Sequence, residues 1–285
     1  MTAPTASGPI VVGTDLGPSS EPALEEAAGW AKRTGAPLSV VHVAATLSHV
    51  DHVRAADALR SRSLGKMDAL GVRAEIVLRE GSAHAELIRY ADETKARLLV
   101  VGVSHKKALE RLFGSTVERV ARHAHCAVLV ARTSPAKGPV LVATDFSSSA
   151  GGAIQAAAAE AKARGVPLHV VHALFEAESA LSALGPAIIS VPVLSTQQRA
   201  EVTDSARQTL NTLLENSGVA GTTEILFGDP GHAVAVAAER ARASLVVVAT
   251  HGRTGLLRIA LGSVAEYVVR HTTCSVLVER LPAEA

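Results

Sequence analysis

Residues 9–15 read Pro9-Ile10-Val11-Val12-Gly13-Thr14-Asp15, and nearly the same stretch returns as Pro139-Val140-Leu141-Val142-Ala143-Thr144-Asp145, an offset of 130 positions. Each copy is a short β-branched run that ends in Thr-Asp, which is typical of a buried strand followed by a loop. The other matches, in chain order, are 37–42 with 167–172 at the same offset, and Gly114-Ser115 with Gly262-Ser263 and Cys126 with Cys274 at an offset of 148. Two steady offsets in one order predict a tandem duplication whose second copy is longer in its middle.

Each copy alternates apolar strand-like runs with helix-favouring stretches. In the first copy the expected strands are 10–12, 38–43, 75–78, 98–101 and 127–130. The expected helices are 21–34, 55–70, 83–94 and a segment after residue 114. Apolar strands that alternate with helices favour a parallel sheet covered on both faces. The sequence therefore predicts an α/β protein of two doubly wound, Rossmann-like domains in tandem, each with a five-stranded parallel sheet.

Three segments follow from the repeat. Residues 1–134 form the first expected domain and 140–285 the second, and the short Pro/Gly-bearing stretch 135–139 forms the linker. The extra residues of the second copy fall at about 175–200, where two X-Pro pairs predict a long surface loop or irregular segment.

Composition excludes several classes of protein. Apolar residues make up 48% of the chain and aromatics 2%, so the core must consist of small aliphatic side chains. The 28 basic and 27 acidic side chains leave a formal charge of +1, which removes the electrostatic reason to expect a nucleic-acid partner. The longest weakly polar run, 183–194, is too short for a membrane span, and the first residues lack the pattern of a signal peptide, so a cytoplasmic protein without membrane contact is expected.

Carboxylates follow the first strand of each copy. Ligands of open parallel sheets lie beyond the carboxyl ends of the strands, where Asp15 and Asp145 stand. A carboxylate at this point can accept hydrogen bonds from ribose hydroxyls. The alternative is that each Asp caps the following helix, because serines follow closely.

A glycine-bearing loop follows the fourth strand of the second copy. Gly252 lies seven positions after the strand's first residue, Leu245, and Gly262-Ser263 opens an apolar-periodic segment ten positions later. Glycines let backbone N–H groups approach phosphate oxygens, and a helix N-terminus favours an anion. A glycine turn with an ordinary serine cap is the alternative.

The spacing resembles the nucleotide-binding pattern of the universal stress protein family, in which Gly, two residues, Gly and nine residues precede Gly-Ser or Gly-Thr. The second copy has Ala249 at the first glycine and keeps Gly252 and Gly262-Ser263. Thr-Asp-Phe-Ser at 144–147, Val171-His172 and the last strand at 274–278 also resemble the family. The resemblance covers almost the whole chain, twice.

The resemblance implies an adenine-nucleotide site, with ATP as the ligand and Mg²⁺ or Mn²⁺ carried on its phosphates. Adenine would lie against the backbone near Ala173, the nucleoside near Asp145, and the phosphates near the start of the last helix. The implied residues of the second copy are Ala143, Thr144, Asp145, Ala173, Ala249, Gly252, Gly262, Ser263 and Val264.

The first copy departs from the pattern. His105 stands at the second glycine, and eight residues instead of nine separate it from Gly114, although Lys106 and Lys107 still favour an anion. We therefore expect weaker nucleotide binding in the first copy, or none. Its corresponding residues are Gly13, Thr14, Asp15, Val43, Gly102, His105, Gly114, Ser115 and Thr116.

No catalytic constellation emerges from the sequence. The chain has neither a Gly-x-Ser-x-Gly elbow nor a Walker A motif, and nothing offers a base for a γ-phosphate. The expected function is a regulatory stress-response module that binds ATP and acts on an unidentified protein partner. A slow ATPase or nucleotide-dependent enzyme, and a scaffold of the same fold that binds nothing, are the alternatives.

Two histidine patterns and the assembly complete the predictions. His-x-x-Cys at 123–126 and 271–274 lacks further ligands, so a core role is expected in place of a metal site. His84 and His232 stand at matching positions before helical segments, where a cap or packing role is expected. By family resemblance the strands 127–130 and 275–278 pair across an internal pseudo-twofold axis, and a further homodimer stays open.

Overall fold

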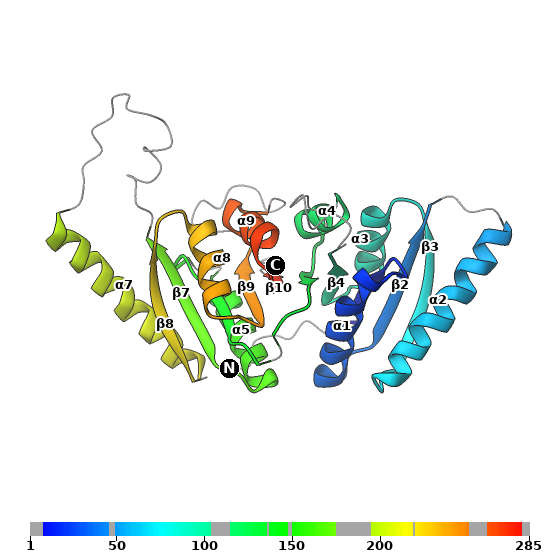
Figure 1. The fold of residues 1–285 in the computed structure, drawn as a ribbon, viewed down its shortest axis with the longest axis horizontal. Coiled ribbons are helices and arrows are strands. Elements are labelled where there is room, and N and C mark those ends of the chain that lie inside the picture. Colours follow the sequence, from blue (N-terminus) through cyan, green and yellow to red (C-terminus); the bar gives the residue numbers. More distant parts are fainter. Residues whose placement is uncertain are drawn as a thin grey trace, which may run out of the picture. The chain divides into compact units, whose positions relative to one another are not determined.

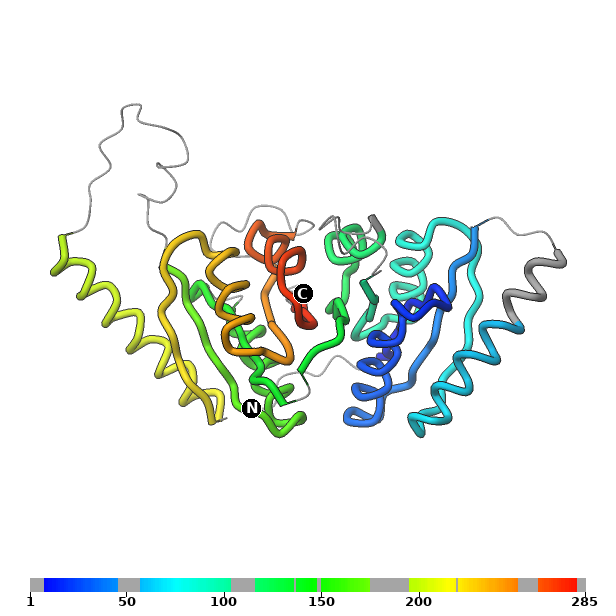
Figure 2. Tube along the Cα trace, in the orientation of Figure 1, coloured from blue at the N-terminus to red at the C-terminus, as the bar shows by residue number. Residues whose placement is uncertain are grey.

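The computed structural model describes residues 8–45, 49–103, 115–135, 137–147, 150–174, 195–218, 220–250 and 261–280, without the side chains of 49–56 and 115. The chain divides into two compact units, coloured blue to green and green to red in Figures 1 and 2. The first unit comprises Met1–Thr133 with Ile259–Leu261 and Leu277–Arg280. The second comprises Ser134–Arg258, Gly262–Val276 and Leu281–Ala285.

The first unit is a parallel sheet with the strand order β3-β2-β1-β4-β5. Helices α1 and α2 contact each other on one face, and α3 contacts α4 on the other (Figure 1). The strands are β1 (Ile10–Thr14), β2 (Leu38–Ala44), β3 (Ala74–Glu80), β4 (Leu98–Gly102) and β5 (Ala127–Ala131). The helices are the short 3₁₀ turn η1 (Pro18–Ser20), α1 (Glu21–Thr34), α2 (His49–Ala69), α3 (Ala83–Glu93) and α4 (Ser115–His123).

The second unit repeats this plan with the order β8-β7-β6-β9 and with β10 beside β9. Helices α5 and α7 contact each other, as do α8 and α9. The strands are β6 (Val140–Ala143), β7 (Leu168–Leu174), β8 (Gly221–Phe227), β9 (Leu245–Ala249) and β10 (Ser275–Glu279). The helices are α5 (Ala150–Arg164), α7 (Thr196–Ser217), α8 (Pro230–Arg240) and α9 (Ser263–His271). The predicted pair of doubly wound α/β domains is confirmed.

Small aliphatic side chains fill the core of both units. The first three residues of β1 and of β6 are fully buried, which the β-branched runs of the sequence predict. In α5 the buried face is mainly alanine, at Ala153, Ala157 and Ala161. Such helices approach a Val-rich sheet closely, and each fully buried Val or Leu stabilises the fold by about 1.5–3 kcal/mol. This packing explains a core almost without aromatic residues.

The longer middle of the second unit is partly helical. The expected irregular segment runs to about residue 200, but α7 begins at Thr196, so that part of the prediction is wrong. The Ser195 hydroxyl accepts from Gln198 N at 3.2 Å, and the Gln198 side chain accepts from Ser195 N at 3.0 Å. This reciprocal capping box starts the helix. Residues 175–194 lie outside the described residues. No helix within the described ranges is long and apolar enough to cross a membrane.

Candidate nucleotide site at the carboxyl ends of the strands

A cavity of about 230 Å³ opens in the second unit at the carboxyl ends of β6, β7 and β9. The chain leaves β6 toward β7 on one side, while β9 lies on its other side, so the cavity lies where the strand order reverses. The lining residues are Ala143, Thr144, Asp145, Ala150, His172, Ala173, Pro230, Val234, Val248, Ala249, Thr250, Gly262, Ser263, Val264 and Ala265.

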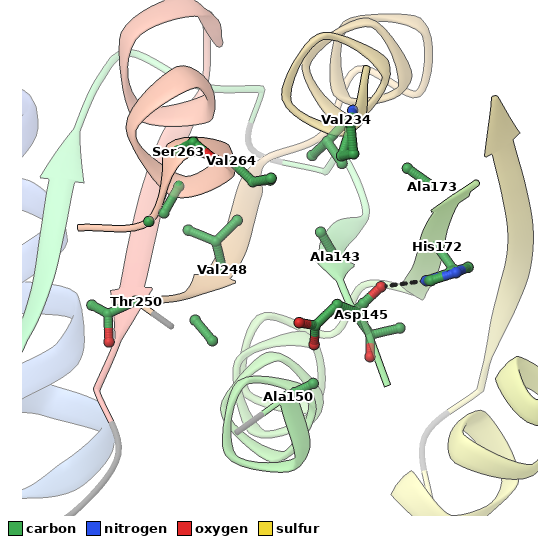
Figure 3. Close-up of a pocket in the computed structure, with 15 residues that line it drawn as sticks. Ala143, Asp145, Ala150, His172, Ala173, Val234, Val248, Thr250, Ser263 and Val264 are labelled. Atoms are coloured by element: carbon green, nitrogen blue, oxygen red, sulfur yellow. Dashed lines mark hydrogen bonds between the residues drawn. The ribbon is translucent and has the colours of Figure 1, made fainter. Parts of the chain in front are cut away.

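The structure brings most of the expected residues of the second copy together. Eight of the nine line the cavity, and Gly252 lies outside the described residues. Figure 3 shows Asp145 beyond β6, with Ser263 and Val264 of α9 across the cavity. The Asp145 carboxylate and the N-terminus of α9 therefore border the same cavity.

The loop after β6 holds Asp145 in place by short-range bonds. Asp145 Oδ1 accepts from the Ser147 backbone N–H at 3.0 Å and from the Ser147 hydroxyl at 2.5 Å. Thr144 Oγ1 accepts from the backbone N–H of Phe146 at 3.1 Å. Phe146 has a φ of 62°, a left-handed conformation that side chains rarely adopt, and it turns the chain sharply after the strand. The bond that Oδ1 accepts from the Ser147 backbone N–H, two positions on, closes an Asx-turn, and the Ser147 hydroxyl adds a second bond to the same oxygen.

His172 supports the same loop from β7. Its Nδ1 donates to the Thr144 carbonyl at 2.7 Å, because a carbonyl only accepts, and this bond is drawn in Figure 3. The imidazole also stacks on Phe146 with ring centroids 4.0 Å apart. The Thr144 carbonyl and the Phe146 ring thereby fix the position of His172 in the cavity wall.

The first turn of α9 forms the opposite wall. Gly262 is the N-cap, its N–H donates to the Thr250 carbonyl at 2.9 Å, and it makes no side-chain cap bond. Ser263 is the first residue of the helix, so the reading of Ser263 as the cap is wrong. A Cβ at Gly262 would lie 3.0 Å from the Thr250 oxygen, which explains the glycine. The positive end of the helix dipole borders the cavity and favours a bound anion.

The sequence analysis did not identify the residues that the helices contribute to the cavity wall. Ala150 of α5 and Pro230 and Val234 of α8 line the cavity, as do Val248, Thr250 and Ala265. Their residue types do not indicate a binding role in the sequence, because these side chains contribute the shape of the cavity. His172 also belongs here, and the Val171-His172 pair, which the structure places within β7, was the one sequence signal that pointed to it.

The first unit places most of its corresponding residues in the same way. Gly13, Thr14 and Asp15 lie at the end of β1, Val43 lies in β2 and Gly102 ends β4. Thr116 lies in the first turn of α4. His105 and Gly114 are outside the described residues, and Ser115 is described by its backbone alone.

Known proteins resemble the chain along nearly its whole length. The sequence model of the Universal stress protein family matches residues 7–132 and 138–280. Universal stress protein Rv2005c of Mycobacterium tuberculosis is 30% identical, over 98% of this chain and 99% of that protein. Universal stress protein YxiE of Bacillus subtilis is 33% identical over 50% of this chain and 97% of its own length. A crystal structure of a universal stress protein from Archaeoglobus fulgidus covers 96% of this chain and 98% of its own with a TM-score of 0.71, and at 23% identity it shows a shared fold.

Proposed function

The chain belongs to the universal stress protein family, and on that premise we propose that its second unit binds an adenine nucleotide, ATP in the first place, as a regulatory stress-response module. One observation carries the proposal. A cavity at the point of strand reversal has the Asp145 carboxylate on one side and the N-terminus of α9 on the other. That pairing suits a ligand with hydroxyl donors at one end and an anion at the other.

The proposed roles follow the chemistry of the walls. Asp145 accepts from ribose hydroxyls, and the backbone near Ala173 faces the adenine. The first turn of α9, at Gly262, Ser263 and Val264, donates to the phosphates. Ala143, Thr144 and Ala249 line the cavity with small groups between these ends. Gly252, three positions after Ala249 in the sequence, lies outside the described residues.

A divalent cation fits this site only through the nucleotide. Asp145 is the single carboxylate among the lining residues, whereas Mg²⁺ held by protein needs several oxygen ligands. We therefore propose that Mg²⁺ or Mn²⁺ binds to phosphate oxygens of the ligand.

The direct test uses the full chain. Purified protein is heat-denatured, and the released small molecules are separated by chromatography; an adenine nucleotide in near-stoichiometric amount is expected. Isothermal titration of nucleotide-stripped protein with ATP should then show saturable binding. Absence of both nucleotide release and ATP binding would reject this function and favour the scaffold. Overnight incubation with ATP and Mg²⁺ separates the slow ATPase, because a regulatory module produces ADP at the background rate.

A further inference from the structure

The helices that follow the third and fourth strands contact each other in both units, but a different side chain lies at this contact in each. Arg119 is the fifth residue of α4, and Tyr267 is the fifth residue of α9, so the two occupy the same place. The Tyr267 hydroxyl lies 3.2 Å from His232 Nδ1, and its ring stacks on His271 with centroids 3.9 Å apart. In the second unit this place therefore holds an uncharged phenol with aromatic partners.

In the first unit the same place holds a guanidinium group. Arg119 Nη1 donates to His84 Nε2 of α3 at 3.2 Å, because a guanidinium group only donates. His84 Nε2 therefore carries no proton, and the proton of the neutral ring lies on Nδ1, which donates to the Ser82 hydroxyl at 2.9 Å. Ser82 thus fixes the imidazole, and the imidazole in turn orients the guanidinium group of Arg119.

Positive charge gathers around this imidazole. Burial lowers the pKa of His84, and the charges of Arg119 and His123 lower it further. His123 lies four positions after Arg119, so both side chains are on one face of α4. Glu118 pairs with Arg122 at 3.2 Å, and within the described ranges Arg119 forms no ion pair with a carboxylate. The guanidinium charge is therefore available to an anionic ligand.

The position of these cations corresponds to the phosphate end of the cavity in the second unit. There Pro230 of α8 and Ser263 of α9, each the first residue of its helix, line the cavity. In the first unit His84 directly follows the first residue of α3, and Arg119 lies one turn after the first residue of α4. Arg119 is also exposed, so a ligand in solution can reach its guanidinium group.

The chemistry of the guanidinium group suits a phosphate. It has several N–H donors, and the bond to His84 uses one of them. The other donors form a planar fork that matches two phosphate oxygens, and such charge-assisted bonds are stronger than neutral ones. Because the imidazole already orients the group, less conformational freedom is lost when a ligand binds.

We propose that the first unit binds a phosphate group through Arg119, with His84 as the positioning residue and His123 as a second positive charge. The ligand class is a small molecule with a diphosphate or terminal phosphate, either inorganic diphosphate or the phosphate end of a nucleotide. We assign the site to the first unit because the second has Tyr267 at this place. The proposal is separate from nucleotide binding by the second unit, since it uses no residue of that cavity.

The test counts the diphosphate that the full chain binds. Inorganic diphosphate is titrated calorimetrically into nucleotide-stripped wild type, Arg119→Ala and Arg207→Ala. Arg207 is an exposed arginine of α7 that pairs with Asp204, so its removal changes the net charge equally in the second unit. Both arginines are exposed, so both variants should fold.

Arg119→Ala should bind one equivalent fewer than Arg207→Ala, or bind that equivalent about tenfold more weakly, the size of one lost charge-assisted hydrogen bond. This difference is expected whether or not the second unit also binds diphosphate. Equal stoichiometry and affinity in the two variants would overturn the proposal, as would a wild type that binds no diphosphate.

Two further comparisons test the fork and its positioning. Arg119→Lys keeps the charge but loses the fork, so it should bind diphosphate more weakly than wild type, and equal binding would contradict recognition by the fork. His84→Ala should also weaken binding, because the guanidinium group loses its acceptor. His84→Gln restores an acceptor oxygen and should recover part of the affinity. Equal affinities of the two His84 variants would contradict the positioning role.

ATP and adenosine identify the source of the phosphate group. If the phosphate end of a nucleotide binds at Arg119, the Arg119→Ala variant also loses one equivalent of ATP; if diphosphate alone is lost, the ligand is diphosphate itself. Either result supports the site. Adenosine binding by the second unit should be the same in Arg119→Ala and wild type. A wild type that binds diphosphate but neither ATP nor adenosine would reject the function proposed for the second unit and still support the site at Arg119.

Discussion

At the scale of the residue, an aspartate follows the first strand of each unit, in a loop of the same backbone conformation. Asp15 and Asp145 each follow a buried strand and a threonine, and in each loop the next residue is left-handed, Leu16 or Phe146. The strand end and the turn are therefore common to both units. The residue that follows the turn differs, because Ser20 of the first unit corresponds to Ala150 of the second. In both loops a serine hydroxyl donates to the carboxylate, from Ser20 to Asp15 Oδ1 and from Ser147 to Asp145 Oδ1.

Removing the carboxylate from the second unit gives a first prediction. Asp145→Ala should weaken ATP binding by about 1–3 kcal/mol, since a charge-assisted hydrogen bond to the nucleoside is lost. Asp145→Asn keeps an acceptor and the shape of the loop and should lose less. Both are measured by isothermal titration beside circular dichroism spectra. Equal affinity of Asp145→Ala and wild type would leave Asp145 with a structural role in its turn.

The glycine at the start of α9 gives a second prediction. Gly262→Ala places a Cβ 3.0 Å from the Thr250 carbonyl oxygen, so the helix start or the Thr250 carbonyl must give by a few tenths of an ångström. We expect Gly262→Ala to weaken ATP binding and Gly262→Val to abolish it, measured by titration. Unchanged affinity in the valine variant would show that phosphate groups do not approach here.

The polar and glycine residues of the candidate site could be predicted from the sequence, whereas the residues that shape the cavity could not. Asp145 and Gly262 stand out because their types at strand and helix ends have a physical meaning. Ala150 and Val234 have no such meaning in sequence. They reach the cavity through the packing of α5 and α8 against the sheet, which depends on side chains far away in the chain.

At the scale of the element, the third helix of the second unit begins one position earlier than the offset of 148 predicts. His84 is the second residue of α3, and His232 is the third residue of α8, so the expectation of matching positions is wrong. The offset of the elements from α3 to β4 is 147, and it becomes 148 at α4 and α9. The residue missing from the first copy therefore falls between β4 and α4. That agrees with the eight-residue spacing before Gly114.

The contact between α8 and α9 gives a third prediction. A Cβ at Gly231 would lie 2.7 Å from the Cβ of Tyr267, so Gly231→Ala should force the two helices apart. We expect a loss of about 1–3 kcal/mol in the free energy of unfolding, measured by urea denaturation, and weaker ATP binding because both helices line the cavity.

Gly151 in α5 is the matched control for this prediction. A Cβ there has no atom within 4 Å, so Gly151→Ala should stabilise the helix by about 0.5–1 kcal/mol. If both alanine variants had the same stability, close packing of α8 on α9 would not be the reason for Gly231.

Helix ends were the least predictable feature at this scale. The start of α7 is fixed by Ser195 and Gln198, and the pattern Ser-x-x-Gln was present in the sequence. The prediction of a loop there rested on the two nearby X-Pro pairs, whereas the Ser-x-x-Gln pattern is the signal that indicates the helix start. The strands were predicted well, because a fully buried parallel strand must be apolar along its whole length.

At the scale of the whole molecule, the stability of the fold depends on pH through an acidic side chain at the end of β10. Glu279 is the last residue of this strand, and burial raises its pKa from 4.5 to about 7 while the charge of Arg97 opposes the rise. A carboxyl group that is protonated in the folded chain but ionised in the unfolded chain makes stability depend on pH. The folded state binds more protons between pH 4.5 and 7, so the free energy of unfolding falls as the pH rises through this window.

Glu279→Gln tests this dependence with a side chain of the same shape. The amide stays neutral, so the variant should be more stable than wild type by about 1–3 kcal/mol at about pH 8, with the difference vanishing below about pH 4.5, where the carboxyl is protonated in both states. Thermal or urea unfolding from about pH 4 to 8 measures it. Asp204→Asn, at an exposed carboxylate of α7, is the control and should show no comparable change. If the stability of the wild-type chain instead rose over this range relative to the Glu279→Gln variant, Arg97 would be stabilising the carboxylate in its charged form.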